Sequence, residues 1–228
     1  MRILSVETSA KTASAAIWQD GVVIGEYNLN AGYTHSHTIM PMIQSLLDMT
    51  GLSIDGIDRI AVAAGPGSFT GLRIGMAAVK GISFATGIEC IPVSTLLAIC
   101  YNLAGMGGII CPAMDARRDN VYTALYSFGS DGRPESLYAD CAATLAEITA
   151  EIDRLDQPVT IIGDGAELVY GHLKDSGIYN PDRHMLAPIQ MRLQKAASLA
   201  VAAGHITETV SGDRLLPVYL RQPMAMQN

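Results

Sequence analysis

The segment best suited to chemistry is a glycine-rich turn between an expected strand and an expected helix. Residues 65–75 spell Gly-Pro-Gly-Ser-Phe-Thr-Gly-Leu-Arg-Ile-Gly, and residues 58–64 before them are apolar and β-branched enough for a buried strand. Many phosphate-binding loops share this order of strand, turn and helix, because the backbone N–H groups at the start of a helix attract an anion. The segment is therefore a candidate anion site.

The spelling of this segment excludes several well-known loops. A Walker loop needs a lysine after its last glycine, but Leu72 follows Gly71 and the next lysine is Lys80. The dinucleotide pattern G-x-G-x-x-G fails because the third glycine comes one place late, and the hydrolase elbow G-x-S-x-G fails on both sides of Ser68. An equally supported interpretation is structural: the glycines permit a tight turn, Ser68 or Thr70 caps the helix, and nothing binds.

Two other polar clusters are weaker candidates. Residues 7–9 (Glu-Thr-Ser) end the first expected strand, and residues 115–122 place an acid and two arginines in a loop that could clamp an anion. A hydrogen-bonded or salt-bridged turn is the favoured interpretation of both. His35 and His37 would point to different faces of a helix, and no H-x-x-x-H pattern occurs, so we expect no metal site and assign no catalytic residue.

Composition predicts a globular, cytoplasmic protein. The 228 residues are 49 % hydrophobic, with no apolar run near the roughly 20 residues of a membrane span, and the first residues break too soon for a signal peptide. A net charge of −7, without a Lys/Arg cluster, disfavours direct nucleic-acid binding. Four cysteines without a C-x-x-C pair predict buried, reduced thiols. Only 16 % of residues are charged, which points toward an apolar interface.

The expected elements form two similar halves of α/β type. In the first half, strands are expected at 2–7, 12–19, 22–29, 58–64 and 89–93, with helices at 36–49, 70–85 and 94–104. In the second half, strands are expected at 108–114, 120–128, 135–141 and 159–162, with helices at 144–154, 166–175 and 190–203. This order predicts two lobes, residues 1–105 and 106–189, with a helix and tail at 190–228 that pack back on the body.

Two of the expected helices carry more apolar or small residues than one packed face needs. Helix 36–49 is apolar around most of its circumference and contains Pro41, whereas helix 70–85 is rich in small residues that permit close approach of another helix. Packing of these helices on each other and a subunit interface are equally supported at this point. The candidate interface residues are Ile39, Met40, Met42, Ile43, Leu46, Leu47, Gly71, Arg73, Gly75, Met76 and Val79.

Six segments, in order from end to end, resemble the bacterial TsaB family, formerly called YeaZ. They are RILSVETS (2–9), THSHTIMPMI (34–43), GPGSFTGLRIG (65–75), MDARR (114–118), GDG (163–165) and PVYLR (217–221). The resemblance implies a two-lobed fold of the actin, hexokinase and Hsp70 type, with a ribonuclease H-like βββαβα unit in each lobe. It also implies that Thr8, Ser9, Gly65, Gly67 and Ser68 are the remains of a nucleotide site.

The resemblance further implies a non-catalytic partner of TsaD in making threonylcarbamoyladenosine on tRNA. TsaC forms threonylcarbamoyl-adenylate from threonine, bicarbonate and ATP, TsaD moves the group to the adenosine 3′ of the anticodon, and TsaE is the associated ATPase. The two helices described above would contact TsaD, or a second copy when the chain is alone. TsaE would join this complex, tRNA would be reached only through it, and ATP and metal would be held by the partners rather than by this chain.

The sequence departs from the residues usual in the family at a few positions. Glu7 stands where the family commonly has Asp, His37 where Glu is usual, and residues 119–120 (Asp-Asn) where Gly-Glu is usual. His37 lies at the start of the presumed partner helix, so it would alter pairing there.

One alternative function is a small kinase or hydrolase of the same superfamily that binds ATP at Thr8, Ser9 and residues 65–68. The other, a protease acting on TsaD, is disfavoured because the sequence carries no recognisable triad or metal motif.

Overall fold

The chain forms two compact units. A computed structural model describes residues 1–32 and 34–220, so Arg221 and the rest of the expected tail lie outside the described residues. Residues 1–101 and 194–219 form the first unit, and residues 102–193 form the second unit. The expected lobe boundaries, after 105 and after 189, lie four residues from these divisions.

The first unit is built on one mixed five-stranded sheet with the order β3-β2-β1-β4-β5. The strands are β1 (Arg2–Glu7), β2 (Ala13–Gln19), β3 (Val22–Leu29), β4 (Arg59–Gly65) and β5 (Cys90–Ser94). The helices are α1 (His35–Thr50), α2 (Phe69–Thr86), α3 (Thr95–Cys100) and α6 (Ala196–Gly204), with short 3-10 turns at Ile54–Gly56 and Gly212–Arg214. β1, β2 and β3 are antiparallel, whereas β4 and β5 run parallel to β1, as expected for hairpins followed by helical crossovers.

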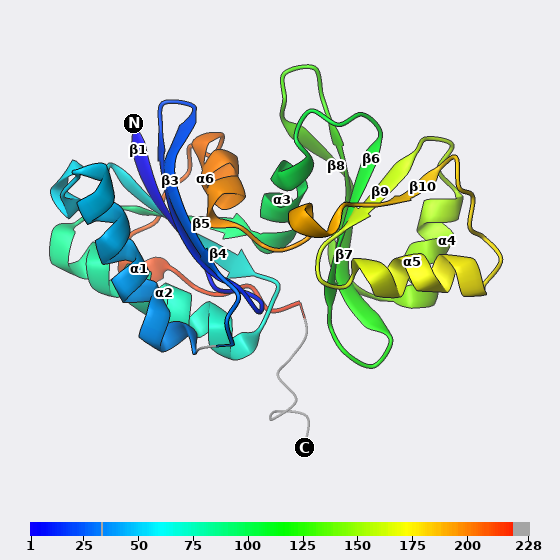
Figure 1. Ribbon diagram of the computed structural model, residues 1–228, viewed down its shortest axis with the longest axis horizontal. Helices are drawn as coiled ribbons and strands as arrows, with labels where there is room; N and C mark the ends of the chain where they lie inside the picture. Colours follow the sequence, from blue (N-terminus) through cyan, green and yellow to red (C-terminus); the bar gives the residue numbers. More distant parts are fainter. Residues whose placement is uncertain (33, 221–228) are drawn as a thin grey trace. The chain divides into compact units, whose positions relative to one another are not determined.

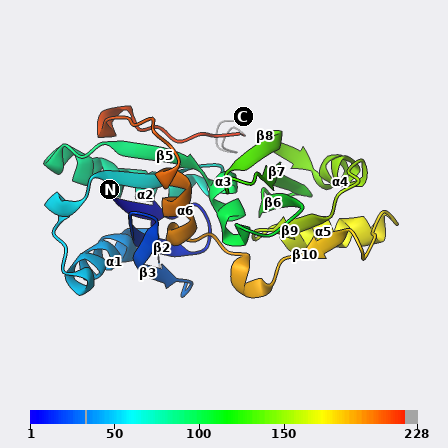
Figure 2. The ribbon, with the colours of Figure 1, turned by 90° about the horizontal axis from the view of Figure 1, so that it is seen from above.

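Helices cover both faces of this sheet, and strand β1 shows why (Figure 1, Figure 2). Leu4 and Val6 point to the face covered by α1 and α2 and belong to its core. Ser5 points to the opposite face, where its hydroxyl donates to the Ala196 carbonyl at the start of α6 (2.7 Å). Because successive side chains of a strand alternate between faces, one strand anchors both helical layers.

The start of α6 differs from the helix expected at 190–203. Residues 189–191 form a separate 3-10 turn, and α6 begins only at Ala196. The reason lies in β2: the Thr12 hydroxyl donates to the Gln194 carbonyl (3.1 Å), and the Ser14 hydroxyl accepts the Ala196 N–H (3.0 Å). These hydroxyls satisfy the backbone groups that a longer helix would use, so β2 sets the position at which the helix starts.

The second unit contains a sheet with the order β10-β9-β6-β7-β8. Its elements are β6 (Ile109–Asp115), β7 (Asn120–Phe128), β8 (Pro134–Thr144), α4 (Leu145–Asp153), β9 (Val159–Ile162), α5 (Ala166–Asp175), β10 (His184–Leu186) and a 3-10 turn at Ile189–Met191. Another 3-10 turn, Tyr101–Leu103, spans the division between the two units. Helices α4 and α5 pack on one face over a core that includes Ile148, Val169 and Leu173. A capping box starts α4: the Thr144 hydroxyl accepts the Glu147 N–H, and the Thr144 N–H lowers the pKa of the Glu147 carboxyl.

The second unit contains a buried histidine whose surroundings disfavour its charged form. His184 in β10 is 2 % exposed, and its Nδ1 accepts the Asn180 N–H (3.1 Å). Burial, reinforced by the positive charge of Arg183, lowers the pKa of His184 below its ordinary value of 6.5, while Asp153 acts in the opposite direction. The folded unit therefore favours the neutral imidazole.

Lowering the pH from 8 to 5 is expected to reduce the free energy of unfolding more in the wild type than in the His184→Gln variant. As the pH falls below 6.5, the unfolded chain takes up a proton on this imidazole before the folded chain does. The free energy of unfolding therefore decreases as the pH falls from 6.5 to the lowered pKa of the folded state. Urea unfolding at both pH values measures the two differences. Equal losses in wild type and variant would contradict the assignment.

Candidate functional site

The glycine segment, residues 65–75, joins three parts of the first unit. The Ser68 N–H donates to the Ser9 carbonyl (2.6 Å), which ties the segment to the loop after β1. The Ser68 hydroxyl accepts the Gly71 N–H (3.2 Å) and caps α2, as one of the two interpretations of this segment predicts. At the end of β4, the Ala64 carbonyl accepts the Val218 N–H (2.7 Å) from the C-terminal part of the chain.

Close approach of main chains explains the glycines of this segment. A Cβ at Gly67 would collide with the Ser9 carbonyl oxygen, one at Gly71 with the Thr8 carbonyl oxygen, and one at Gly75 with the Thr8 hydroxyl. That hydroxyl donates to the Gly71 carbonyl (2.8 Å). Glycine is needed because two backbones meet where no side chain fits, a requirement that exists without any ligand.

The residues of the expected nucleotide site are thus together, but they contact one another. Thr8 and Ser9 are 1 % and 0 % exposed, and Gly65 approaches the Val218 carbonyl oxygen. The Ser9 N–H donates to the Glu7 carboxylate (2.6 Å), which is itself buried. The favoured interpretation of residues 7–9, a turn whose hydroxyls satisfy local backbone, is wrong in this detail. The Thr8 hydroxyl donates to the distant Gly71 carbonyl, and the buried Ser9 hydroxyl has no hydrogen-bond partner among the described residues. Binding of a nucleotide there stays a prediction.

Most of the expected interface residues are buried within the first unit, which corrects that part of the expectation. Helices α1 and α2 contact each other and the sheet, and their buried residues belong to the packing beneath. The residues concerned are Ile39, Ile43, Leu46, Leu47, Gly71, Gly75, Met76 and Val79. Because α1 is apolar around most of its circumference, the sequence did not distinguish the side that packs on the sheet from the side that could bind a partner. The structure shows that one side packs on the sheet. Of the remaining three, Met42 is half-buried, whereas Met40 and Arg73 are exposed.

Two exposed apolar residues of these helices were missed by the sequence reasoning. Met49 near the end of α1 is 80 % exposed, and Phe84 near the end of α2 is 94 % exposed. Met40, also on α1, is 46 % exposed. We call Met40, Met49 and Phe84 the exposed apolar residues of the α1/α2 layer. An aromatic ring left in water on a helix is a signal for contact with another molecule, although single exposed apolar residues are common.

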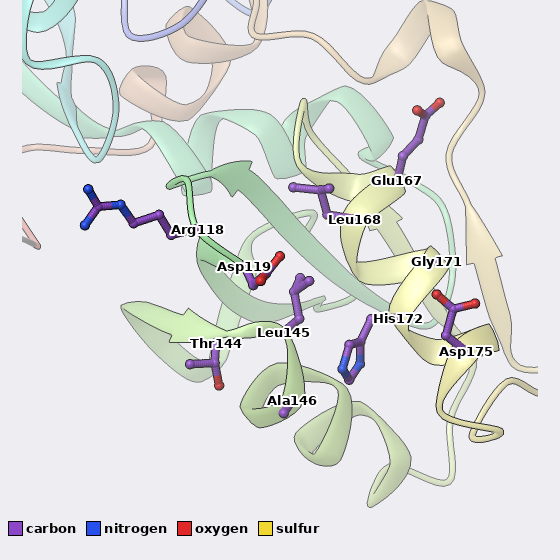
Figure 3. Close-up of a pocket in the computed structure, with 10 residues that line it drawn as sticks. All are labelled: Arg118, Asp119, Thr144, Leu145, Ala146, Glu167, Leu168, Gly171, His172 and Asp175. Atoms are coloured by element: carbon purple, nitrogen blue, oxygen red, sulfur yellow. The ribbon is translucent and has the colours of Figure 1, made fainter.

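A second polar region is a groove in the second unit, between the β6–β7 turn, the start of α4, and α5 (Figure 3). Its volume is about 550 Å³, and Leu145 and Leu168 point toward its interior. Glu167 pairs with Arg192 (2.7 Å), and His172 Nδ1 lies 3.1 Å from the Thr149 hydroxyl. These side chains are already engaged in structural contacts.

The acidic-arginine loop at residues 115–122 is the salt-bridged turn that its favoured interpretation predicts. The Asp115 carboxylate accepts the Arg117 N–H (2.7 Å), and the Arg117 guanidinium lies 3.5 Å from it. The three residues 117–119 all have positive φ (68°, 53° and 57°), an uncommon backbone for residues other than glycine. Arg117 remains 79 % exposed, so its pair contributes little to stability.

The potential metal ligands among the described residues are dispersed. No group of three or more His, Cys, Asp or Glu side chains in this part of the chain could hold a metal ion. His35 Nε2 contacts the Ala10 carbonyl oxygen (2.8 Å) rather than another potential ligand. Burial raises the pKa of Cys111 to about 12, which keeps this thiol protonated and unreactive. Within the same residues, no helix is both long and apolar enough to cross a membrane.

Comparison with solved structures defines the class of fold. A Pseudomonas aeruginosa protein, described as uncharacterized with similarity to peptidase YeaZ, superposes with a TM-score of 0.79 at 25 % identity, covering 96 % of this chain and 99 % of that one. Component A of (R)-2-hydroxyglutaryl-CoA dehydratase from Acidaminococcus fermentans gives 0.50 at 13 % identity, covering 89 % and 97 %. The chain therefore has the α/β fold of actin- and hexokinase-like proteins, as expected.

Sequence comparison defines the family. The TsaB protein of Escherichia coli K12, a tRNA threonylcarbamoyladenosine biosynthesis protein, is 30 % identical over 227 residues, or 99 % of this chain and 96 % of that protein. A family model described as TsaD, tRNA N6-adenosine threonylcarbamoyltransferase, matches residues 29–226. The chain belongs to the TsaB family, formerly YeaZ, whose members act in tRNA threonylcarbamoyladenosine biosynthesis.

Replacing Gly71 by Ala is expected to destabilise the protein by roughly 1–3 kcal/mol, because the new methyl group would force the Thr8 backbone away from α2. Gly81→Ala is the matched control, since a Cβ at Gly81 on the same helix would meet nothing within 4 Å. There alanine should stabilise by up to about 1 kcal/mol through its higher helix propensity. The free energies of urea unfolding test both signs, and equal effects at the two glycines would refute the packing role.

Introducing Asp at Ile43 is expected to unfold or severely destabilise the first unit, because its side chain is 2 % exposed among apolar neighbours. Asp at Met40, one turn earlier on α1 and exposed, should change stability by no more than about 0.5 kcal/mol. Thermal unfolding followed by circular dichroism separates the two outcomes. A well-folded Ile43→Asp variant would show that this position is not part of the core.

Proposed function

We propose that this chain is a non-catalytic partner of TsaD that acts as a scaffold in tRNA threonylcarbamoyladenosine biosynthesis. In this proposal TsaD, bearing ATP and metal, transfers the group that TsaC activates, and TsaE joins the complex. The chain itself holds no cofactor, works in the cytoplasm, and reaches tRNA only through the complex. In isolation it pairs with a second copy through helices α1 and α2, the same helices that contact TsaD.

The observation that carries this proposal is the α1/α2 layer. Its buried residues pack in the hydrophobic core of the first unit, while Met40, Met49 and Phe84 expose apolar side chains to solvent. Exposed residues of this kind suit contact with another protein, because methionine and phenylalanine adapt to and bury apolar area at a protein interface. The match of residues 29–226 to a transferase family model supports a partner built on a related fold.

Polar contacts near the glycine segment support a scaffold rather than an enzyme. The Thr8 hydroxyl donates to the Gly71 carbonyl, and the Ser68 hydroxyl caps α2. The Ser9 hydroxyl has no hydrogen-bond partner among the described residues, but it is buried. A kinase or hydrolase needs such groups free to meet a phosphate, and a protease needs a nucleophile with a general base beside it. The scaffold proposal requires neither arrangement.

The direct test is reconstitution of tRNA modification from purified TsaC, TsaD and TsaE with and without this chain. We expect modification to depend on the chain, and we expect the chain without TsaD to produce none. Calorimetry with ATP and magnesium should give no binding heat for the chain alone. Modification by the chain in the absence of TsaD, or undiminished modification in the absence of the chain, would each contradict the proposal.

The Phe84→Asp variant is expected to bind TsaD at least about tenfold more weakly than the wild type, because a buried, unpaired carboxylate would replace an apolar anchor. Leu137→Asp is the control, since Leu137 is also exposed, at 51 %, but lies on β8 of the second unit. Both variants should keep the wild-type melting temperature. Calorimetry with TsaD measures the affinities, and unchanged affinity of the Phe84 variant would place the interface elsewhere.

A further inference from the structure

A groove of about 460 Å³ runs along α2 on the side that faces the C-terminal residues 215–219 of the same unit. Its lining includes the buried side chains of Met76 and Leu215, which are 3 % and 0 % exposed. Leu216 and Tyr219 also line it and remain 68 % and 37 % exposed. The groove is thus largely apolar and leaves part of its apolar surface in water.

Several contacts hold the groove in shape. The Val218 N–H donates to the Ala64 carbonyl (2.7 Å), which fixes the C-terminal residues beside β4. The Arg73 guanidinium stacks on the Phe69 ring at 3.7 Å and donates through Nε to the Tyr219 hydroxyl (3.1 Å). The rings of Phe69 and Tyr219 lie 5.0 Å apart. A groove formed by such contacts needs little reordering when it binds a partner.

Two cations flank the open side of the groove. Arg73 and Lys80 line it from α2, seven residues apart, with Ala77 between them on the same side of the helix. At 1.5 Å per residue, the two positions are separated by about 10.5 Å along the helix. None of the described lining residues is acidic, and within the described chain neither cation forms an ion pair. Their charges favour an anionic occupant.

We propose that this groove binds an acidic amphipathic helix of TsaD, the partner in the function proposed above, on which this inference rests. Two carboxylates seven residues apart on that helix would meet Arg73 and Lys80, and apolar side chains between them would pack over Ala77 and against Leu216. The small side chain of Ala77 leaves room for this close approach. Residues 221–228 of the chain itself contain one Arg and no Asp or Glu, so charge disfavours them as the occupant.

The test compares TsaD binding by the wild type and by Lys80→Glu in 50 mM NaCl. Reversing one charge should weaken binding roughly fivefold to tenfold, and the difference should shrink in 500 mM NaCl because salt screens exposed charges. The matched control is Lys11→Glu, an exposed lysine of the same unit outside the groove lining, which should change affinity less than twofold. Circular dichroism checks that both variants fold.

A photo-crosslinking residue at Ala77 then identifies the occupant. Crosslinks to a helical TsaD segment with carboxylates seven residues apart are expected. Crosslinks only to a second copy or to residues 221–228 would overturn the inference, as would unchanged binding by Lys80→Glu. If Lys80→Glu binds TsaD as the wild type does but Phe84→Asp binds it weakly, the proposed function is still supported and only this inference fails. If the wild type itself does not bind TsaD, the proposed function fails and this inference fails with it.

Discussion

The fit of the glycine segment against residues 8–9 is the constraint on which the first unit depends. At this place the backbone after β1, the start of α2 and the C-terminal residues meet at distances that exclude side chains. The three glycines that face Thr8 and Ser9 permit this approach, and the Ser68 hydroxyl completes it by capping α2. As a result, α2 has a fixed position relative to β1, and α1 packs beside it on the same core.

This fixed position divides α1 and α2 into a supporting side and an exposed side. The supporting side carries residues such as Ile43 and Val79, which are buried and stabilise the unit by removing apolar area from water. Met40, Met49 and Phe84 lie outside this buried packing and are exposed. A scaffold protein needs both properties together, because a rigid surface loses less conformational freedom when it binds. The same segment that looks like a phosphate loop can therefore serve assembly.

Much of the fold could be predicted from the sequence because its local signals agree. The short apolar runs of β1 and β4 and the serines that cap α2 and α3 predicted elements within a few residues of those observed. The beginning of α6 could not be predicted, because it is set by Thr12 and Ser14, which lie about 180 residues away in the sequence. The groove beside α2 was missed for the same reason: Arg73 and Tyr219 are 146 residues apart.

The candidate site was predicted less well than the fold, since its identity depends on which side of a helix is covered. An α1 that is apolar almost all round gives no local signal to distinguish Ile43, which is buried, from Met40, which is exposed. Likewise, Gly67 and Gly71 have the same spelling whether they accommodate a phosphate or a neighbouring main chain. The family resemblance supplied the fold and the pathway, but the placement of side chains required the structure.

The central claim is that TsaD binds the exposed side of the α1/α2 layer while the buried side remains as it is. Hydrogen–deuterium exchange of the chain, alone and with saturating TsaD, measures this most directly. The account predicts slower exchange on TsaD binding in α1 and α2 and unchanged exchange in α4 and α5 of the second unit. Protection confined to the second unit, with α1 and α2 unaffected, would contradict it.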